Sequence, residues 1–164
     1  MTTSRAPQSP KPLSTADLQA CLELAGDREW PWEDVKWEFL LRVGQGYGVV
    51  DAAGRLVASA VLSRFGDLAA ISMVLVAKEY SGQGLGTRLM RHVIAEAGGA
   101  TVTLYATASG QPLYEKLGFR VLSGTETFVG TFTGAASGIS RPAAADDLPA
   151  IIALDAAVVG ADRG

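Results

Sequence analysis

The sequence predicts an α/β fold, with one mixed sheet and helices on both of its faces. The first indication is residues 71–97, where an apolar run, a glycine-rich loop and a helical pattern follow one another. The second is another strand-like run at residues 101–106, because a strand–helix–strand unit places its two strands parallel. The third is a pair of strand-like runs joined at Ala53-Gly54, a turn typical of antiparallel strands.

Two helices and the hairpin precede the central strand. Ser14 or Thr15 can cap a helix over residues 17–25. Pro31 fits the first turn of a second helix over residues 32–42, since proline is tolerated there. The strands expected next are residues 48–51 and 55–64 of the hairpin, and residues 68–76 of the central strand.

The second half of the chain alternates helices and strands. The long helix that starts at Leu85 should end at Gly98-Gly99, because glycine is the preferred residue just past a helix. After the strand at residues 101–106 we expect a short helix over residues 110–117. Strands at residues 119–122 and 125–133 would then complete an antiparallel end of the sheet.

Composition narrows the class of protein. The chain has 164 residues, of which 48% are hydrophobic and 19% charged, so it is long enough and apolar enough for one domain with a core. A net charge of −3 argues against nucleic acid or an anionic membrane as the main partner. Cys21 is the single cysteine and cannot form an internal disulfide. With no apolar run near ~18 residues and no signal-peptide core, we expect a cytoplasmic protein.

The glycine loop is typical of an anion site. It reads SGQGLG from Ser81 to Gly86 and opens a helix. Glycine lets the backbone approach an anion closely, and the first amide groups of a helix are unpaired at the positive end of its dipole. Neither the G-x-G-x-x-G dinucleotide fingerprint nor the P-loop is present.

The loop resembles the acyl-CoA loop of the GNAT superfamily of N-acetyltransferases. That pattern is Arg or Gln, two variable residues, Gly, one variable residue, then Gly or Ala; Gly84 and Gly86 match it, while Ser81 departs from it. A second run, LYEKLGF at residues 113–119, resembles the Y-x-x-x-G-F motif of the same superfamily. The segment before it, residues 106–112, reads ATASGQP and is similar to the corresponding segment in a subgroup of tandem-domain bacterial GNAT proteins.

The resemblance implies a central, mostly antiparallel sheet with a splayed parallel strand pair that holds acetyl-CoA. Backbone groups of the central strand would bind the pantetheine arm, and loop amides would bind the pyrophosphate. Thr107 stands where the superfamily often has an asparagine that contacts pantetheine. The expected cofactor-binding residues are Val74, Leu75, Val76, Ser81, Gly82, Gln83, Gly84, Leu85, Gly86, Thr87 and Thr107.

Tyr114 is the expected catalytic residue. When an amine attacks a thioester, a thiolate leaves, and a phenol with a pKa of ~10 can protonate the departing sulfur. The general base stays open: the central strand has no acid, so the candidates are Asp67, three acids before the hairpin, or a chain of water molecules. Those three acids are Glu29, Glu33 and Asp34.

The sequence says less about the binding site of the acceptor, which is the amine that would receive the acetyl group. Trp30, Trp32 and Trp37 precede the hairpin, where they either pack in the core or wall a pocket for a hydrophobic or cationic amine. We take Trp30, Trp32 and Asp67 as substrate residues, and expect a small-molecule amine as partner and no metal. The expected function is N-acetylation by direct attack in a ternary complex. The alternative is a catalytically degenerate, acyl-CoA-binding or structural half of a tandem GNAT protein.

The two ends suggest a wider organisation. Residues 1–12 are expected to be a flexible leader, which would leave a sheet edge open, and residues 13–133 the GNAT domain. Residues 134–164 contain a small-residue linker, then DDLPAIIAL, which echoes the start of the chain and is expected to be the first strand and helix of a truncated second domain. The apolar side chains of that helix would be a site of association. We therefore expect the tail to dock on this domain or on a second copy, which would give a homodimer by segment exchange.

Overall fold

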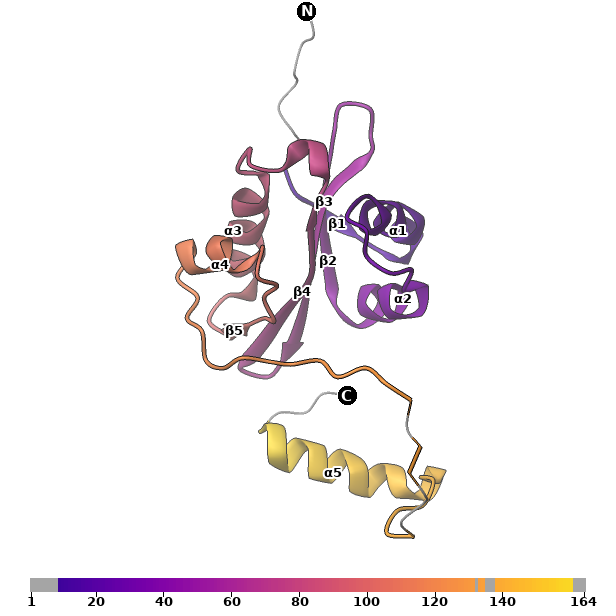
Figure 1. Cartoon of the computed structure of the whole chain (residues 1–164). Coiled ribbons are helices and arrows are strands. Elements are labelled where there is room, and N and C mark those ends of the chain that lie inside the picture. The colour runs from indigo at the N-terminus through magenta and orange to yellow at the C-terminus, as the bar shows by residue number, and fades with distance from the viewer. Residues whose placement is uncertain (1–8, 132, 135–137, 161–164) are drawn as a thin grey trace, which may run out of the picture.

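The computed structural model describes residues 9–131, 133–134 and 138–160. These residues form a five-stranded sheet between helices (Figure 1), with the strands side by side in sequence order. The strands are β1 (Lys11–Leu13), β2 (Gln45–Val50), β3 (Leu56–Phe65), β4 (Leu68–Val76) and β5 (Thr101–Thr103). The helices are α1 (Leu18–Asp27), α2 (Asp34–Val43), α3 (Leu85–Ala97), α4 (Gln111–Lys116) and α5 (Leu148–Val159), with short 3-10 turns at Thr15–Asp17, Lys78–Tyr80 and Ala145–Asp147.

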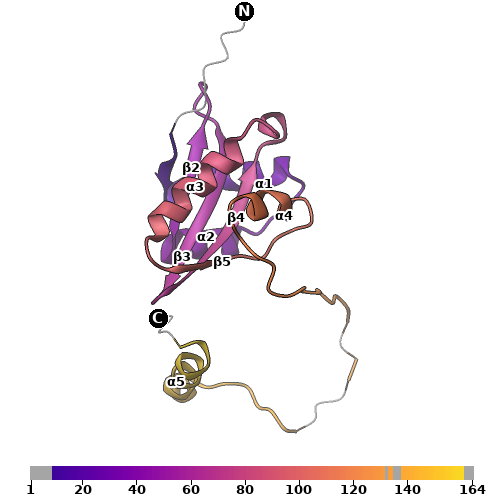
Figure 2. The same cartoon turned by 90° about the vertical axis from the view of Figure 1, so that its left-hand side faces the viewer.

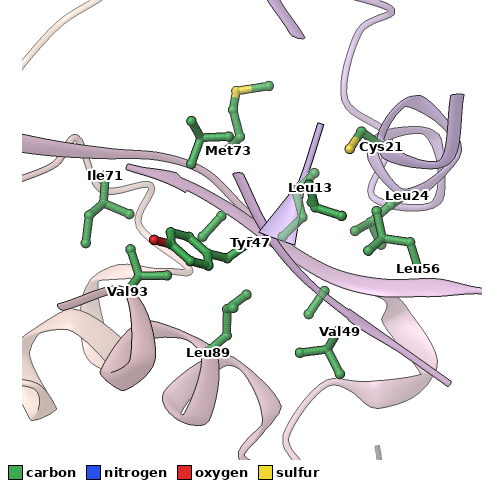
Figure 3. Close-up of a cluster of buried hydrophobic side chains, with 14 of the residues drawn as sticks. Leu13, Cys21, Leu24, Tyr47, Val49, Leu56, Ile71, Met73, Leu89 and Val93 are labelled. Atoms are coloured by element: carbon green, nitrogen blue, oxygen red, sulfur yellow. The ribbon is translucent and has the colours of Figure 1, made fainter. Parts of the chain in front are cut away.

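The helices cover the sheet from both sides, as predicted. Helices α1 and α2 lie on one face and α3 on the other, which the two perpendicular views show together (Figures 1 and 2). Figure 3 shows Val93 of α3 beside Ile71, Leu89 further along the same helix, and Cys21 of α1 on the opposite side of the strands. Each of these side chains is buried, so the strands carry apolar residues on both faces.

The two parallel strands pair over a short length. Leu68, Ala69 and Ala70 of β4 pair with β5, whereas the later residues of β4 that have a ladder partner pair only with β3. The predicted strand over residues 101–106 is therefore too long, because beyond Thr103 the chain leaves β4 and has no ladder partner. The backbone edge of β4 from Ile71 to Val76 is left free on that side.

Strand β4 contains a bulge at its middle. The pairing register between β3 and β4 shifts between Ser59 and Val61, opposite Met73. Met73 has a φ of 52°, which is rare for a residue with a side chain and is a local strain. Bulges bend a strand and increase its twist, so this one turns the end of β4 away from β5.

Several element boundaries were predicted correctly. β4 spans Leu68–Val76 and α3 ends at Ala97, just before Gly98, as the glycine signal indicated. Ser14 caps the first helical turn: its hydroxyl accepts from the Ala16 amide at 3.3 Å. The second helix begins at Asp34 rather than at Trp32, so the placement of Pro31 in its first turn was wrong.

The strands predicted after α4 were also wrong. Residues 119–131 contain no strand, and the side chains of Val121, Leu122 and Phe128 are exposed. A strand needs a hydrogen-bonding neighbour and a face to bury, and the three-residue β5 provides a short edge. Residue 132 of the second predicted strand lies outside the described residues.

The N-terminal edge of the sheet differs from the expectation as well. Strand β1 begins at Lys11, inside the predicted leader, and Leu13 pairs with Gly46 of β2. The open edge predicted on that side is thus covered by a strand, and Pro12 is tolerated because β1 is the edge strand. Residues 1–8 of the predicted leader lie outside the described residues.

The tail forms its predicted helix without the predicted strand. Residues 138–144 contain no strand, and α5 follows over Leu148–Val159. α5 lies apart from the sheet in both views, and none of its residues is buried. Docking on this domain is therefore not seen, and docking on a second copy stays a prediction. Residues 135–137 of the predicted linker and 161–164 of the tail lie outside the described residues.

Candidate functional site

A cleft of about 430 Å³ opens where β4 and β5 separate. This size suits a small-molecule or cofactor site. The end of α1, the end of β4, the start of α3, and α4 with the residues before it contribute its walls. The lining residues are Arg28, Trp30, Val74, Leu75, Val76, Tyr80, Ser81, Gly82, Gly84, Leu85, Gly86, Thr87, Thr107, Ser109, Gly110, Leu113 and Tyr114.

The glycine loop presents backbone donors to this cleft. Gly82 and Gly84 have φ values of 75° and 77°, a conformation that favours glycine. A Cβ atom at either position would meet no atom within 4 Å, so the space in front of the loop is open. Within the described part of the chain, the amides of residues 82–87 have no backbone acceptor. Unpaired amides at the start of α3 are suited to bind a phosphate group.

The free edge of β4 forms a second part of the cleft. Val74, Leu75 and Val76 line it, and none of the described strands pairs with them on the β5 side. Their peptide groups can therefore pair with an extended amide-containing ligand, as a further strand would. The loop and this edge together fit the two parts of coenzyme A, a phosphate-bearing head and a pantetheine arm with two amides.

Tyr114 reaches the cleft from α4. Its ring stacks edge-on against Phe119, with ring centroids 6.0 Å apart, and 9% of the side chain is exposed. Gly110 allows this packing, because a Cβ there would lie 3.0 Å from a ring carbon of Tyr114. Burial raises the pKa of the Tyr114 phenol. The phenol therefore keeps its proton at neutral pH, and no described residue forms a hydrogen bond with its hydroxyl.

Thr107 organises the start of α4. Its hydroxyl accepts a hydrogen bond from the Gly110 amide at 3.2 Å and lies 3.1 Å from the Ser109 hydroxyl. Its carbonyl oxygen accepts from the amides of Gly110 and Gln111. Thr107 thus acts as a cap for the turn that carries Tyr114 and also lines the cleft.

Most of the residues predicted for cofactor binding meet at this cleft, and three predicted site residues do not line it. Gln83 lines a separate, smaller hollow of about 170 Å³, and its side-chain amide donates to the Glu79 carbonyl oxygen. Trp32 is 64% exposed. Asp67 lies before the first residue of β4, at the opposite end from the loop and about 30 Å from it along the strand.

The acids considered as a general base also lie elsewhere. Glu29 forms an ion pair with Lys78, and Glu33 forms one with Lys36 at 3.0 Å. Among the described residues, no carboxylate lines the cleft.

Sequence reasoning missed five lining residues. Tyr80 directly precedes the loop, and Ser109, Gly110 and Leu113 adjoin the motif that contains Tyr114, so proximity to the motifs could have found them. Arg28 had no such signal, because it lies 53 positions before Ser81, to whose hydroxyl it donates a hydrogen bond.

Comparison with known proteins agrees with this geometry. Residues 44–121 match the profile of the family described as the acetyltransferase (GNAT) domain, a span that contains β2 to α4. These residues form a GNAT acetyltransferase domain. The GNAT domain accounts for the loop, the splayed strands and the Tyr114 helix in one architecture.

Relatives of known sequence or structure support the assignment. An uncharacterized N-acetyltransferase of Bacillus subtilis, YitH, is 34% identical over 109 residues, which cover 65% of this chain; the chain spans 39% of the length of that relative. The crystal structure of the ribosomal-protein-S18-alanine N-acetyltransferase from Escherichia coli has a TM-score of 0.64 and 27% identity, and covers 70% of this chain and 79% of its own. A GNAT-family protein from Novosphingobium aromaticivorans is 40% identical, with a TM-score of 0.57, over 68% of this chain and 51% of its own.

Two absences concern the described residues alone. None of the helices described here has the length and hydropathy needed to cross a membrane. In the same part of the chain, His, Cys, Asp and Glu side chains do not gather in groups of three or more that could hold a metal ion.

Proposed function

We propose that the GNAT domain transfers the acetyl group of acetyl-CoA to the primary amine of a small molecule. The observation that carries this proposal is the single cleft shared by three features: the open amides of residues 82–87, the free edge of β4 and the buried phenol of Tyr114. Each feature suits a different part of the same reaction. The family of the domain and its N-acetyltransferase relatives support the transferase class.

In the proposed reaction, the amine nitrogen attacks the thioester carbonyl carbon while both substrates are bound. A nitrogen–carbon bond forms, and the carbon–sulfur bond then breaks. Tyr114 donates its proton to the departing sulfur, and the proton that leaves the nitrogen restores the phenol. A backbone amide near Leu75 or Val76 would stabilise the oxyanion, since these residues line the cleft.

The acceptor amine loses two protons in this proposal: the first leaves before the attack and goes to solvent, and the second leaves after the nitrogen–carbon bond has formed and restores the phenol. A primary amine with a pKa of ~10 is mostly protonated at neutral pH, and no described carboxylate lines the cleft. Transfer should therefore accelerate as pH rises from about 7 towards about 9, because the fraction of free amine increases. A degenerate, acyl-CoA-binding domain would bind the coenzyme without this activity.

The test combines calorimetry with turnover. The protein is titrated with acetyl-CoA, and free thiol release is then followed with a panel of amines for the wild type and for Tyr114→Phe. We expect binding in both, and turnover that falls about 10²–10⁴-fold in the variant. Binding without turnover on any amine would favour the degenerate alternative, and no binding would overturn both functions.

A further inference from the structure

Arg28 brings a positive charge to the cleft from a distant part of the chain. It is the residue just past α1, and one of its guanidinium nitrogens donates to the Ser81 hydroxyl at 3.4 Å. Ser81 and Arg28 both line the cleft beside the glycine loop. The loop itself, from Ser81 to Thr87, contains no Lys or Arg.

The turn that carries Arg28 has a defined shape. The Trp30 amide donates to the Ala25 carbonyl oxygen at 3.0 Å, and the Glu29 amide donates to that of Gly26 at 2.9 Å. This is the Schellman pattern of a helix end, in which a left-handed residue usually follows the cap. Glu29 occupies that position with a φ of 59°, where glycine would cost less. The turn is thus held in a conformation that its own sequence does not favour.

Contacts with the segment before the loop hold this turn in place. The Asp27 carboxylate accepts from the Lys78 amide at 2.7 Å, and Glu29 forms an ion pair with the Lys78 ammonium. Both acidic neighbours of Arg28 are therefore bound to Lys78, three positions before Ser81. Because Asp27 and Glu29 are both held by Lys78, Arg28 between them is directed towards the glycine loop.

Arg28 forms no direct ion pair within the described part of the chain, although its charge contributes, after Lys78, to the lowered pKa of the neighbouring Glu29. Its hydrogen bond to Ser81 is long and has a neutral acceptor. Arg28 as a whole residue is half-buried, and its guanidinium contacts Ser81, next to loop amides that have no backbone acceptor in the described residues. A cation and unpaired N–H groups on one wall form a site for an anion, and guanidinium is well suited to phosphate.

We propose that Arg28 binds the pyrophosphate of the coenzyme together with the loop amides, and so supplies from α1 the cation that the loop lacks. The proposal rests on the proposed function, because the anion is taken to be that of acetyl-CoA. The position of Trp30 adds a second consequence. Trp30 lies two residues after Arg28 and lines the same cleft, so coenzyme binding at Arg28 would also order the part of the wall proposed to contact the amine.

Calorimetry with Arg28→Gln tests the proposal. We expect a fall of about 10- to 100-fold in the affinity for acetyl-CoA, the usual effect of losing a charged hydrogen bond. The affinity for S-acetylpantetheine, which has no pyrophosphate, should be unchanged. Arg42→Gln is the matched control, since Arg42 pairs with Glu38 on α2 and does not line the cleft. It should bind both ligands as the wild type does.

The double variant Arg28→Gln/Ser81→Arg distinguishes a role of Arg28 in binding the coenzyme from a role in maintaining the fold. It returns a cation to the same place from the loop side, and we expect it to recover most of the affinity for acetyl-CoA. An Arg28→Gln protein with unchanged affinity for acetyl-CoA overturns the inference alone, as does an equal loss for both ligands, which would mean a structural role for Arg28. A wild-type protein that does not bind acetyl-CoA overturns the proposed function, and the inference with it.

Discussion

The hydroxyl of Ser59 in β3 donates a hydrogen bond of 3.0 Å to the carbonyl oxygen of Met73 in β4. Met73 is the strand residue with a φ of 52°, and Ser59 is fully buried next to it. The bond satisfies a carbonyl group that the bulge turns out of the strand ladder. It therefore stabilises the bend just before Val74, where the free edge of the cleft begins.

Removing this hydroxyl should destabilise the domain. Ser59→Ala leaves the Met73 carbonyl oxygen buried without that donor, and we expect the free energy of unfolding to fall by about 1–3 kcal/mol. Urea denaturation measures the change. Ser72→Ala is the control on the neighbouring strand, because the Ser72 hydroxyl is buried and finds no hydrogen-bond partner among the residues that the structure describes. Its removal should leave stability unchanged or raise it, and equal losses in the two variants would contradict the role of Ser59.

Two glycines with the same backbone conformation distinguish coenzyme binding from backbone strain. Gly84 and Gly54 have φ values of 77° and 83°, and a Cβ at either would meet no atom within 4 Å. Gly84→Asp should abolish acetyl-CoA binding in calorimetry, since it places a negative charge where the pyrophosphate is expected. Gly54→Asp, in the β2–β3 turn and outside the cleft lining, should keep wild-type affinity. Binding by Gly84→Asp at the level of Gly54→Asp would exclude the loop from the site.

Stability at high pH should depend on Tyr114. Burial holds the pKa of its phenol above the value of about 10 that it has in the unfolded chain. Below about pH 10 both states are protonated, and above it the unfolded state binds fewer protons, so stability falls as pH rises towards the folded-state pKa. The pKa of Tyr47 is also raised, first by burial and then by Glu96, so part of the fall remains in Tyr114→Phe.

Urea denaturation at about pH 8 and about pH 10.5 measures that difference. The loss of stability between the two should be smaller in Tyr114→Phe than in the wild type. Tyr105→Phe is the control, because the Tyr105 side chain is 89% exposed. A pH dependence in Tyr114→Phe equal to that of the wild type would show that the phenol is not buried in solution.

The two tryptophans around Pro31 should differ in their effect on the acceptor. Trp30 lines the cleft, while Trp32 is 64% exposed. We expect Trp30→Ala to raise the KM for the amine by about tenfold, as loss of an aromatic contact of ~1.4 kcal/mol would do. Trp32→Ala should leave the KM within about twofold. Steady-state kinetics at saturating acetyl-CoA decides this, and equal effects would remove Trp30 from the acceptor wall.

The sequence determined the elements whose causes are local. The glycines around residues 82–86 and the periodic apolar residues of α3 predicted the loop and both ends of that helix. The motif around Tyr114 predicted α4 and its place in the cleft. A positive φ, a helix cap and an amphipathic face each depend on residues within a few positions, so one stretch of chain contains all the information needed.

The tertiary structure decided whatever needs a partner from elsewhere in the chain. β5 ends at Thr103 because β4 turns away from it, and residues 119–131 form no strand because no long edge is offered to them. Tertiary contacts also decide that Trp30 lines the cleft while Trp32 is exposed, although both flank Pro31 and the sequence gives no reason to distinguish them. They also bring Arg28 to Ser81 across 53 positions, through contacts that Asp27 and Glu29 make with Lys78. Pairing and burial are properties of two segments at once, so neither segment alone could reveal them.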